Sequence, residues 1–251
     1  MKTYNALSKS FTDEVKTIMG EGKTIDEAFE DVKTAIIDYD SPTPTPEPTI
    51  YEYVDLGLPS GTMWATCNVG ATKPEEYGLL FQFGRVDGYA YGDTNNQFVE
   101  NNETSASGKT YNSDEILDLV DDAANVNMGG KWRMPTGSYT ISDDEQVEYS
   151  GELGELINNT THEVVTINGV KGMMFTSNIN SNQLFIPFAG FWISGDGSFI
   201  QAGNGAFVWS SQVANLLWLR SDNSADIRTA SKSGSSFNTS FAYSVRGVFK
   251  K

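Results

Sequence analysis

A tract with proline at every second position, SPTPTPEPT at residues 41–49, divides this 251-residue chain. Proline has no backbone N–H to donate and fixes φ near −65°, so this tract cannot join a helix or a central strand. It favours the polyproline II conformation, which rises about 3.1 Å per residue. The sequence therefore predicts three parts: a helical anchor (1–40), a semi-rigid Pro-rich stalk (41–50) and a head (51–251).

Residues 1–40 read as helical, with a capping-box pattern at Thr24–Glu27. Apolar residues then follow at spacings of four, three and four, which is typical of about two coiled-coil heptads. Isolated helices of this length are marginal in water, so the apolar seam needs a partner. One hypothesis is a helical hairpin packed on itself or on the head. Our main hypothesis is an oligomerisation or docking element, with a homo-trimer as the expected oligomeric state. The seam consists of Ile25, Phe29, Val32 and Ile36.

The head has the pattern of an α+β domain rich in short strands. Helices are predicted over Asn112–Val126, with Ser113 as the cap, and over the sequence GELGELIN at residues 151–158. From Leu184 onward, apolar strand-like runs alternate with turn residues, which indicates an antiparallel sheet. We expect the stretch YVDLGLPSGTMWATCNVGA, residues 53–71, to start the sheet that FAYSVRGVF, residues 241–249, closes.

The charge of the chain argues against several classes of partner. A formal net charge of −16 repels phosphate backbones and anionic lipid surfaces, so we expect no nucleic-acid partner. No apolar run is long enough to span a bilayer, and residues 1–16 lack the apolar core of a secretory signal. We therefore expect no membrane insertion and no export by the usual route. Residues 185–251 differ from the rest, with six basic and three acidic residues.

Few residues in the sequence suggest catalysis or metal binding. Cys67 and His162 are the single cysteine and histidine, which excludes a disulfide framework and a metal site built from several of either. We interpret His162 as an ordinary surface histidine, and Cys67 as a buried structural thiol or a reactive one. The acidic run Ser142–Glu148 is interpreted as a solvated loop, with weak calcium binding as the alternative. We expect no enzymatic activity, cofactor or metal, although paired carboxylates for glycan hydrolysis stay open.

The C-terminal loops have the composition of a recognition surface, in which large rigid rings supply contact area and small polar groups adapt. Trp132 and Trp209 are expected in the core. Trp192, Phe207 and Trp218 stay open between core and surface. The predicted ligand-binding residues are Trp192, Phe199, Asn204, Phe207, Gln212, Asn215, Trp218 and Arg220.

Six blocks of the head occur in a specific order: YVDLGLPSGTMWATCNVGATKPEEYGLLFQFG, KWRMPT, GELGELINNTTHEVVTINGVKGMMFTS, LFIPFAG, FVWSS and YSVRGV. This series resembles the "major paralogous domain" family of FISUMP type, which is common in gut bacteria and their phages. The resemblance covers residues 51–249 and implies a C-type-lectin-like fold. Phe188, Gly247 and the tract Gly137–Ser150 depart from the family pattern. The related formylglycine-generating enzymes depend on a cysteine pair that is absent here, so the resemblance implies no catalysis.

Similar domains serve as the variable proteins of diversity-generating retroelements, in which the C-terminal segment around W-S-S forms the ligand-binding surface. Residues 185–251 correspond to that segment. The layout of anchor, stalk and head, the lectin-like head that the resemblance implies and the missing export signal together favour a phage fibre or virion-surface protein. It would bind a host cell-surface glycan or protein and attach to another virion protein through its N-terminal helices. A bacterial cell-surface adhesin or lipoprotein with its signal removed is the alternative.

Overall fold

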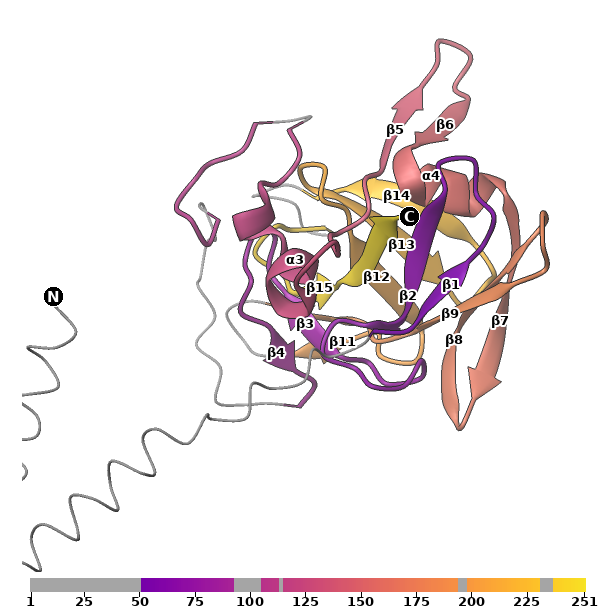
Figure 1. The fold of residues 1–251 in the computed structure, drawn as a ribbon, viewed down its shortest axis with the longest axis horizontal. Helices are drawn as coiled ribbons and strands as arrows, with labels where there is room; N and C mark the ends of the chain where they lie inside the picture. Colours follow the sequence, from indigo (N-terminus) through magenta and orange to yellow (C-terminus); the bar gives the residue numbers. More distant parts are fainter. Residues whose placement is uncertain (1–50, 93–104, 113–114, 194–197, 231–236) are drawn as a thin grey trace, which may run out of the picture. The chain divides into compact units, whose positions relative to one another are not determined.

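Short, mostly antiparallel β-strands make up most of the described chain, which holds only two α-helices (Figure 1). The computed structural model describes residues 51–92, 105–112, 115–193, 198–230 and 237–251. The predicted anchor, the stalk and the seam of Ile25, Phe29, Val32 and Ile36 lie outside these residues. At this coarse level the described part is a β-rich α+β fold, in agreement with the sequence.

The opening stretch and the C-terminal strand share one three-stranded sheet. Trp64 of the central strand lies opposite Val54 on one side and Val248 on the other, and both pairings are antiparallel. Gly61, at φ +70°, closes the turn between the first two strands by donating its N–H to the Leu58 carbonyl at 2.9 Å. The predicted pairing of the opening and closing segments is therefore confirmed. In sheet order the strands are β1 (Tyr53–Asp55), β2 (Thr62–Asn68) and β16 (Arg246–Lys250).

The largest sheet carries most of the C-terminal quarter, as the sequence predicts. Its six strands pair antiparallel except for β12 and β15, which are parallel. In sheet order they are β14 (Ala225–Thr229), β13 (Asn215–Arg220), β12 (Gly205–Trp209), β15 (Tyr243–Ser244), β3 (Leu79–Phe81) and β4 (Tyr89–Ala90). The short strands β10 (Phe191–Trp192) and β11 (Phe199–Ile200) pair beside it, since Gly190 bridges to Ala206 of β12.

Two further strand groups complete the described part. One is an antiparallel sheet of β7 (Thr160–Ile167), β8 (Val170–Ser177) and β9 (Gln183–Pro187). The other is a two-stranded hairpin of β5 (Ser138–Ile141) and β6 (Val147–Ser150), which projects from the body of the fold (Figure 1). This hairpin occupies the tract Gly137–Ser150. The helix α4, Gly151–Asn158, follows it directly and confirms the second predicted helix.

The helix predicted over Asn112–Val126 is wrong over most of its length. The helix α3 covers only Ala123–Met128, and a 3-10 turn, η1, covers Leu119–Asp121. The cap of α3 is Asp122, whose side chain accepts the Asn125 N–H at 2.9 Å. The predicted cap, Ser113, lies outside the described residues.

The residues before η1 pair with a distant loop instead of continuing the helix. The Leu117 N–H donates to the Ser211 carbonyl at 2.8 Å. Leu117 is buried, but Ile116 and Val120, two other apolar residues of the predicted helix, are both more than half exposed. Tertiary hydrogen bonds therefore override the helical periodicity of this segment.

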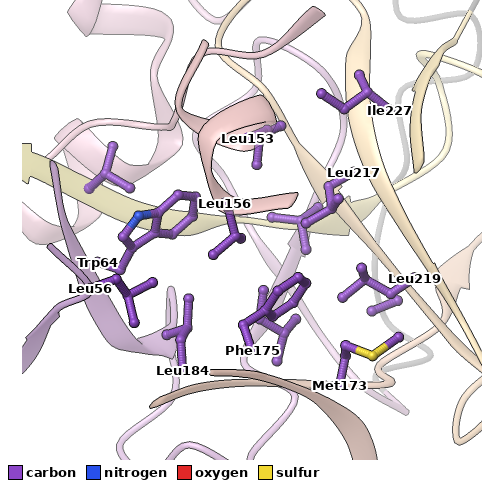
Figure 2. Close-up of a cluster of buried hydrophobic side chains, with 14 of the residues drawn as sticks. Leu56, Trp64, Leu153, Leu156, Met173, Phe175, Leu184, Leu217, Leu219 and Ile227 are labelled. Carbon is purple, nitrogen blue, oxygen red and sulfur yellow. The ribbon is translucent and has the colours of Figure 1, made fainter. Parts of the chain in front are cut away.

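Two apolar clusters lie on opposite faces of β12 and β13, because successive side chains of a strand point to opposite faces. Figure 2 shows the first cluster, where Leu217 and Leu219 of β13 pack with Leu153 of α4 and Trp64 of β2. The second cluster contains Phe207, Trp209 and Leu216. Trp209 and Trp132 are buried, which confirms both as core residues. The second face is the one that leads to the candidate site.

Candidate ligand-binding surface

A row of three residues crosses the six-stranded sheet from its core toward its edge. Phe207 of β12 lies opposite Trp218 of β13, which in turn lies opposite Asp226 of β14. The Phe207 side chain is 2% exposed, whereas Trp218 is half-buried. The Phe207 and Trp218 rings stack with centroids 6.2 Å apart, and Phe237 meets the Trp218 ring edge-on at 5.3 Å. The covered core thus ends at Trp218, where the face becomes accessible.

Arg220 stacks on the ring of Trp218. Because residues two apart on a strand share a face, the sequence NLLWLR brings Trp218 and Arg220 to the same side of β13. The guanidinium carbon of Arg220 lies 4.2 Å from the ring centroid, and that of Arg228 lies 5.9 Å from it. Such cation–π contacts contribute roughly 0.5–1 kcal/mol at exposed sites. The contact holds a flat aromatic face and a hydrogen-bond donor side by side.

Asp226 organises the charged groups around this ring. Its carboxylate lies 2.7 Å from Nη1 of Arg220 and 3.4 Å from Nη2 of Arg228, and it accepts a 2.7 Å hydrogen bond from the Tyr149 hydroxyl. Partly exposed ion pairs contribute only about 0–1 kcal/mol to stability, so their main effect here is to fix the orientation of the guanidinium groups. We call the set Trp218, Arg220, Asp226, Arg228 and Phe237 the Trp218 surface.

The turn between β13 and β14 supports Arg220 from a second side. The Arg220 N–H donates to the Ser224 carbonyl at 3.0 Å, and Asp222 lies 3.6 Å from the Arg220 side chain. Hydrogen bonds from the Ser224 side chain and backbone lower the pKa of the Asp222 carboxyl. Two carboxylates, those of Asp222 and Asp226, thus lie beside Arg220, so the surface combines charges of both signs with an aromatic ring.

Tyr149 links the β5–β6 hairpin to the Trp218 surface. Burial, together with the hydrogen bond to Asp226, raises the pKa of the Tyr149 hydroxyl to about 12. The phenol therefore stays protonated and keeps donating to Asp226 at neutral pH.

Three of the predicted ligand-binding residues belong to the core, and their assignment to a surface is wrong. Trp192 and Phe207 are 2% exposed, and Asn215 is 8% exposed. Trp192 packs between Tyr89 and Phe199, at centroid distances of 5.6 and 4.8 Å. Asn215 accepts the Thr229 hydroxyl at 2.8 Å across the β13–β14 pair. Neighbouring strands cover these side chains, so a ligand at the surface cannot contact them.

Phe199 lies in a second group of aromatic side chains, apart from the set that surrounds Trp218. Its ring is 4.5 Å from that of Tyr91, which is 48% exposed, and Tyr91 also contacts Tyr77 at 5.2 Å. Asn204 is exposed in the turn before β12, one residue from the Gly205–Arg220 pair. Gln212 forms an isolated antiparallel β-bridge with Ile116. Of the predicted set, the structure thus brings together Trp218 and Arg220, both half-buried, at the accessible end of this face.

Sequence reasoning missed Asp226, Arg228, Phe237 and Tyr149 as members or neighbours of this surface. A signal for two of them exists in the turn residues Asp222–Ser224, which predict a hairpin. Its register would have placed Asp226 opposite Trp218. Phe237 and Tyr149 come from distant parts of the chain, and no local pattern in the sequence points to them.

The remaining chemical candidates do not form a site. His162 is half-buried beside Phe175, at 5.5 Å between ring centroids, and burial lowers the pKa of its imidazole, so it is not the open surface residue expected. Cys67 is a free, half-buried thiol 3.6 Å from the Thr66 hydroxyl. Ser142–Glu148 is exposed, as expected for a solvated turn. Among the described residues no group of three acidic, histidine or cysteine side chains could hold a metal ion.

No helix in the described ranges is both long and apolar enough to cross a bilayer. Comparison with family models, curated proteins and solved structures gives no match for this chain. The assignment of the site therefore rests on its geometry.

Proposed function

We propose that this chain is a non-enzymatic adhesion protein whose head binds a host cell-surface glycan or protein through the Trp218 surface. The observation that carries this proposal is the half-buried Trp218 ring flanked by Arg220 and Arg228, with Asp226 holding both guanidinium groups. Tryptophan and arginine dominate the binding energy of many protein interfaces, because they combine a large contact area with directional donors. The same pair can stack on a sugar ring and donate to its hydroxyl groups.

The rigid support of the surface favours binding over catalysis. Trp218 sits on a central strand of the six-stranded sheet, with β12 on one side and β14 on the other. A ligand therefore meets groups that are already ordered, which reduces the conformational entropy lost on binding. Asp226 is engaged by two arginines and a tyrosine hydroxyl and so serves to position cations.

We further propose that the head is a C-type-lectin-like domain of FISUMP type, displayed on a phage particle. The ordered motif blocks and the pairing of β2 with the C-terminal strand β16 support the fold. The Pro-rich tract and the apolar seam of residues 25–36 support display: the seam would form a trimer or dock on another virion protein.

Two experiments test these proposals. The full chain, labelled with a fluorophore, is applied to glycan arrays and to whole cells of gut bacteria. Trp218→Ala and Arg220→Ala should each weaken the signal by about tenfold or more, whereas Tyr91→Ala, an exposed aromatic outside the Trp218 surface, should leave it unchanged. Equal loss in Tyr91→Ala, or no loss in the first two, contradicts the site. Protease treatment of the cells distinguishes a protein receptor from a glycan.

Location is tested separately with an antibody against the head. Labelling of purified phage particles from a culture that carries the gene supports display on the virion. Labelling of the bacterial surface, with none on particles, favours the cell-surface adhesin and contradicts the phage assignment.

A further inference from the structure

The β5–β6 hairpin carries an apolar pair that no other described residue covers. Ile141 and Val147 are direct cross-strand partners at the outer end of the hairpin. Their exposed fractions are 62% and 45%, and the hairpin projects away from the sheets (Figure 1). Side chains on a two-residue period share a face, so this pair continues the face that holds Tyr139 and Tyr149.

The same face is packed at its base and open at its tip. Tyr139 and Tyr149 pack against the first core cluster, whereas the next pair outward has no such cover. The opposite face is polar: the Ser138 and Ser150 hydroxyls lie 2.8 Å apart, and Thr140 pairs with Glu148. The hairpin is therefore amphipathic along its whole length, although only its inner half has a core to pack on.

The backbone of the apolar pair also faces outward. The Ser142 N–H donates to the Gln146 carbonyl at 2.9 Å, so Ser142 and Gln146, the next residues outward from the apolar pair, form a hydrogen-bonded pair. Hydrogen-bonded and non-hydrogen-bonded pairs alternate in an antiparallel ladder, so Ile141 and Val147 form a non-hydrogen-bonded pair. Their N–H and C=O groups point away from the partner strand. Each edge of the hairpin tip thus offers backbone donors and acceptors to an added strand.

Four carboxylates lie close to this pair in the sequence: Asp143, Asp144 and Glu145 in the turn, and Glu148 on the opposite face of the hairpin. The hairpin, residues 138–150, contains no lysine or arginine. None of the four forms an ion pair with any residue that the structure describes. An added strand with basic side chains would neutralise this local charge.

We propose that the tip of the β5–β6 hairpin is a docking edge for an extended segment of a partner protein that alternates basic and apolar residues. The partner adds a strand through backbone hydrogen bonds, its apolar side chains cover Ile141 and Val147, and its basic side chains meet the carboxylates. A second copy of this chain is disfavoured, because two hairpin tips would bring eight carboxylates together. This docking edge does not depend on the ligand of the Trp218 surface.

The test measures, by fluorescence anisotropy, how tightly a short, capped peptide of alternating lysine and valine binds to the full chain. The salt concentration is about 150 mM, where the Debye length is ~8 Å. We expect saturable binding that the double variant Ile141→Ser, Val147→Ser weakens by about tenfold. The matched control is Ile179→Ser, an equally exposed isoleucine between β8 and β9, which should keep wild-type affinity.

Four results would overturn the proposal. If a lysine–serine peptide binds as tightly as the lysine–valine peptide, the contact is purely electrostatic. If a lysine–valine peptide with alternate N-methylated amides binds as tightly as the unmodified peptide, no strand is added. Sedimentation equilibrium measures self-association of the chain. If the chain self-associates and the double serine variant does not, a second copy is the occupant. Absence of any peptide binding also contradicts the proposal.

Discussion

The guanidinium carbon of Arg220 lies 4.2 Å from the centre of the Trp218 ring, on the same face of β13. One strand therefore presents an aromatic surface and a fixed cation two residues apart, at the position where the covered core ends. The carboxylate of Asp226, on the neighbouring strand, holds the cation in place at 2.7 Å. These three groups are the basis of the proposed binding function, and the first prediction concerns the carboxylate.

Asp226→Asn keeps the side-chain shape but removes the charge that orients Arg220 and Arg228. We expect the affinity for the cell-surface ligand to fall by about threefold to tenfold, with stability changed by less than about 1 kcal/mol, because the pairs are partly exposed. Asp222→Asn, in the exposed turn next to Arg220, is the matched comparison and should lower the affinity less than Asp226→Asn does, because its carboxylate is the more distant and more exposed partner of Arg220. Wild-type affinity in Asp226→Asn would show that the carboxylate has no orienting role.

The Tyr149–Asp226 hydrogen bond should be visible in the alkaline stability of the protein. The pKa of Tyr149 is raised to about 12, above its ordinary value, so the protonated phenol is favoured in the folded state. The stability from this group is therefore complete below about pH 10 and is lost as the pH rises toward 12. Denaturant melts of Tyr149→Phe should show a smaller loss of stability over this window than wild type. An identical loss in both proteins would contradict the assigned pKa.

Trp192 and Trp218 should respond differently to truncation. Trp192→Ala removes a fully covered ring from a packed group and is expected to cost about 3–5 kcal/mol in the free energy of unfolding. Trp218→Ala removes a half-buried ring at the edge of the second cluster and should cost less, while weakening ligand binding by about tenfold or more. Denaturant melts give both values. A Trp192→Ala variant of near wild-type stability would contradict the burial of this side chain.

Gly190 is the glycine whose replacement should be most harmful to the strand pair β10–β11. A Cβ at this position would lie 2.1 Å from the Ile200 carbonyl oxygen, and φ is +65°. We expect Gly190→Ala to destabilise the head by about 2–4 kcal/mol. The control is Gly203→Ala, which has φ +77° but no atom within 4 Å of the added Cβ, and should cost only about 1 kcal/mol. Similar melting curves for the two variants would contradict this close backbone approach.

The strands of the C-terminal quarter could be predicted because alternation alone specifies them. In NLLWLR, Leu217 and Leu219 enter one core cluster while Trp218 faces the other side. The helix over Asn112–Val126 could not be excluded in this way, since its periodicity is real and the hydrogen bond from Leu117 to Ser211 joins segments far apart in the sequence. Local pattern thus predicted the strands themselves, whereas it could not reveal that a tertiary hydrogen bond replaces the helix around Leu117.

The candidate site was only partly predictable for the same reason. Composition pointed to Trp218 and Arg220, which the structure places where the covered core ends, but it could not separate Trp218 from Trp192 and Phe207, which are also aromatic. Their burial depends on Tyr89 and Tyr243, whose rings come from other strands and lie 5.6 and 5.4 Å away from them. Which aromatic residues reach the surface is decided by packing between strands.

The most direct test of the account is a double-mutant cycle on Trp218 and Arg220, read as affinity for the ligand that the array identifies. Each alanine substitution should weaken binding by about tenfold or more, and the double variant should lose less than the product of the two, because the stacked pair acts as a unit. Circular dichroism confirms that all variants are folded. Wild-type affinity in both folded single variants would contradict the assignment of ligand binding to the Trp218 surface.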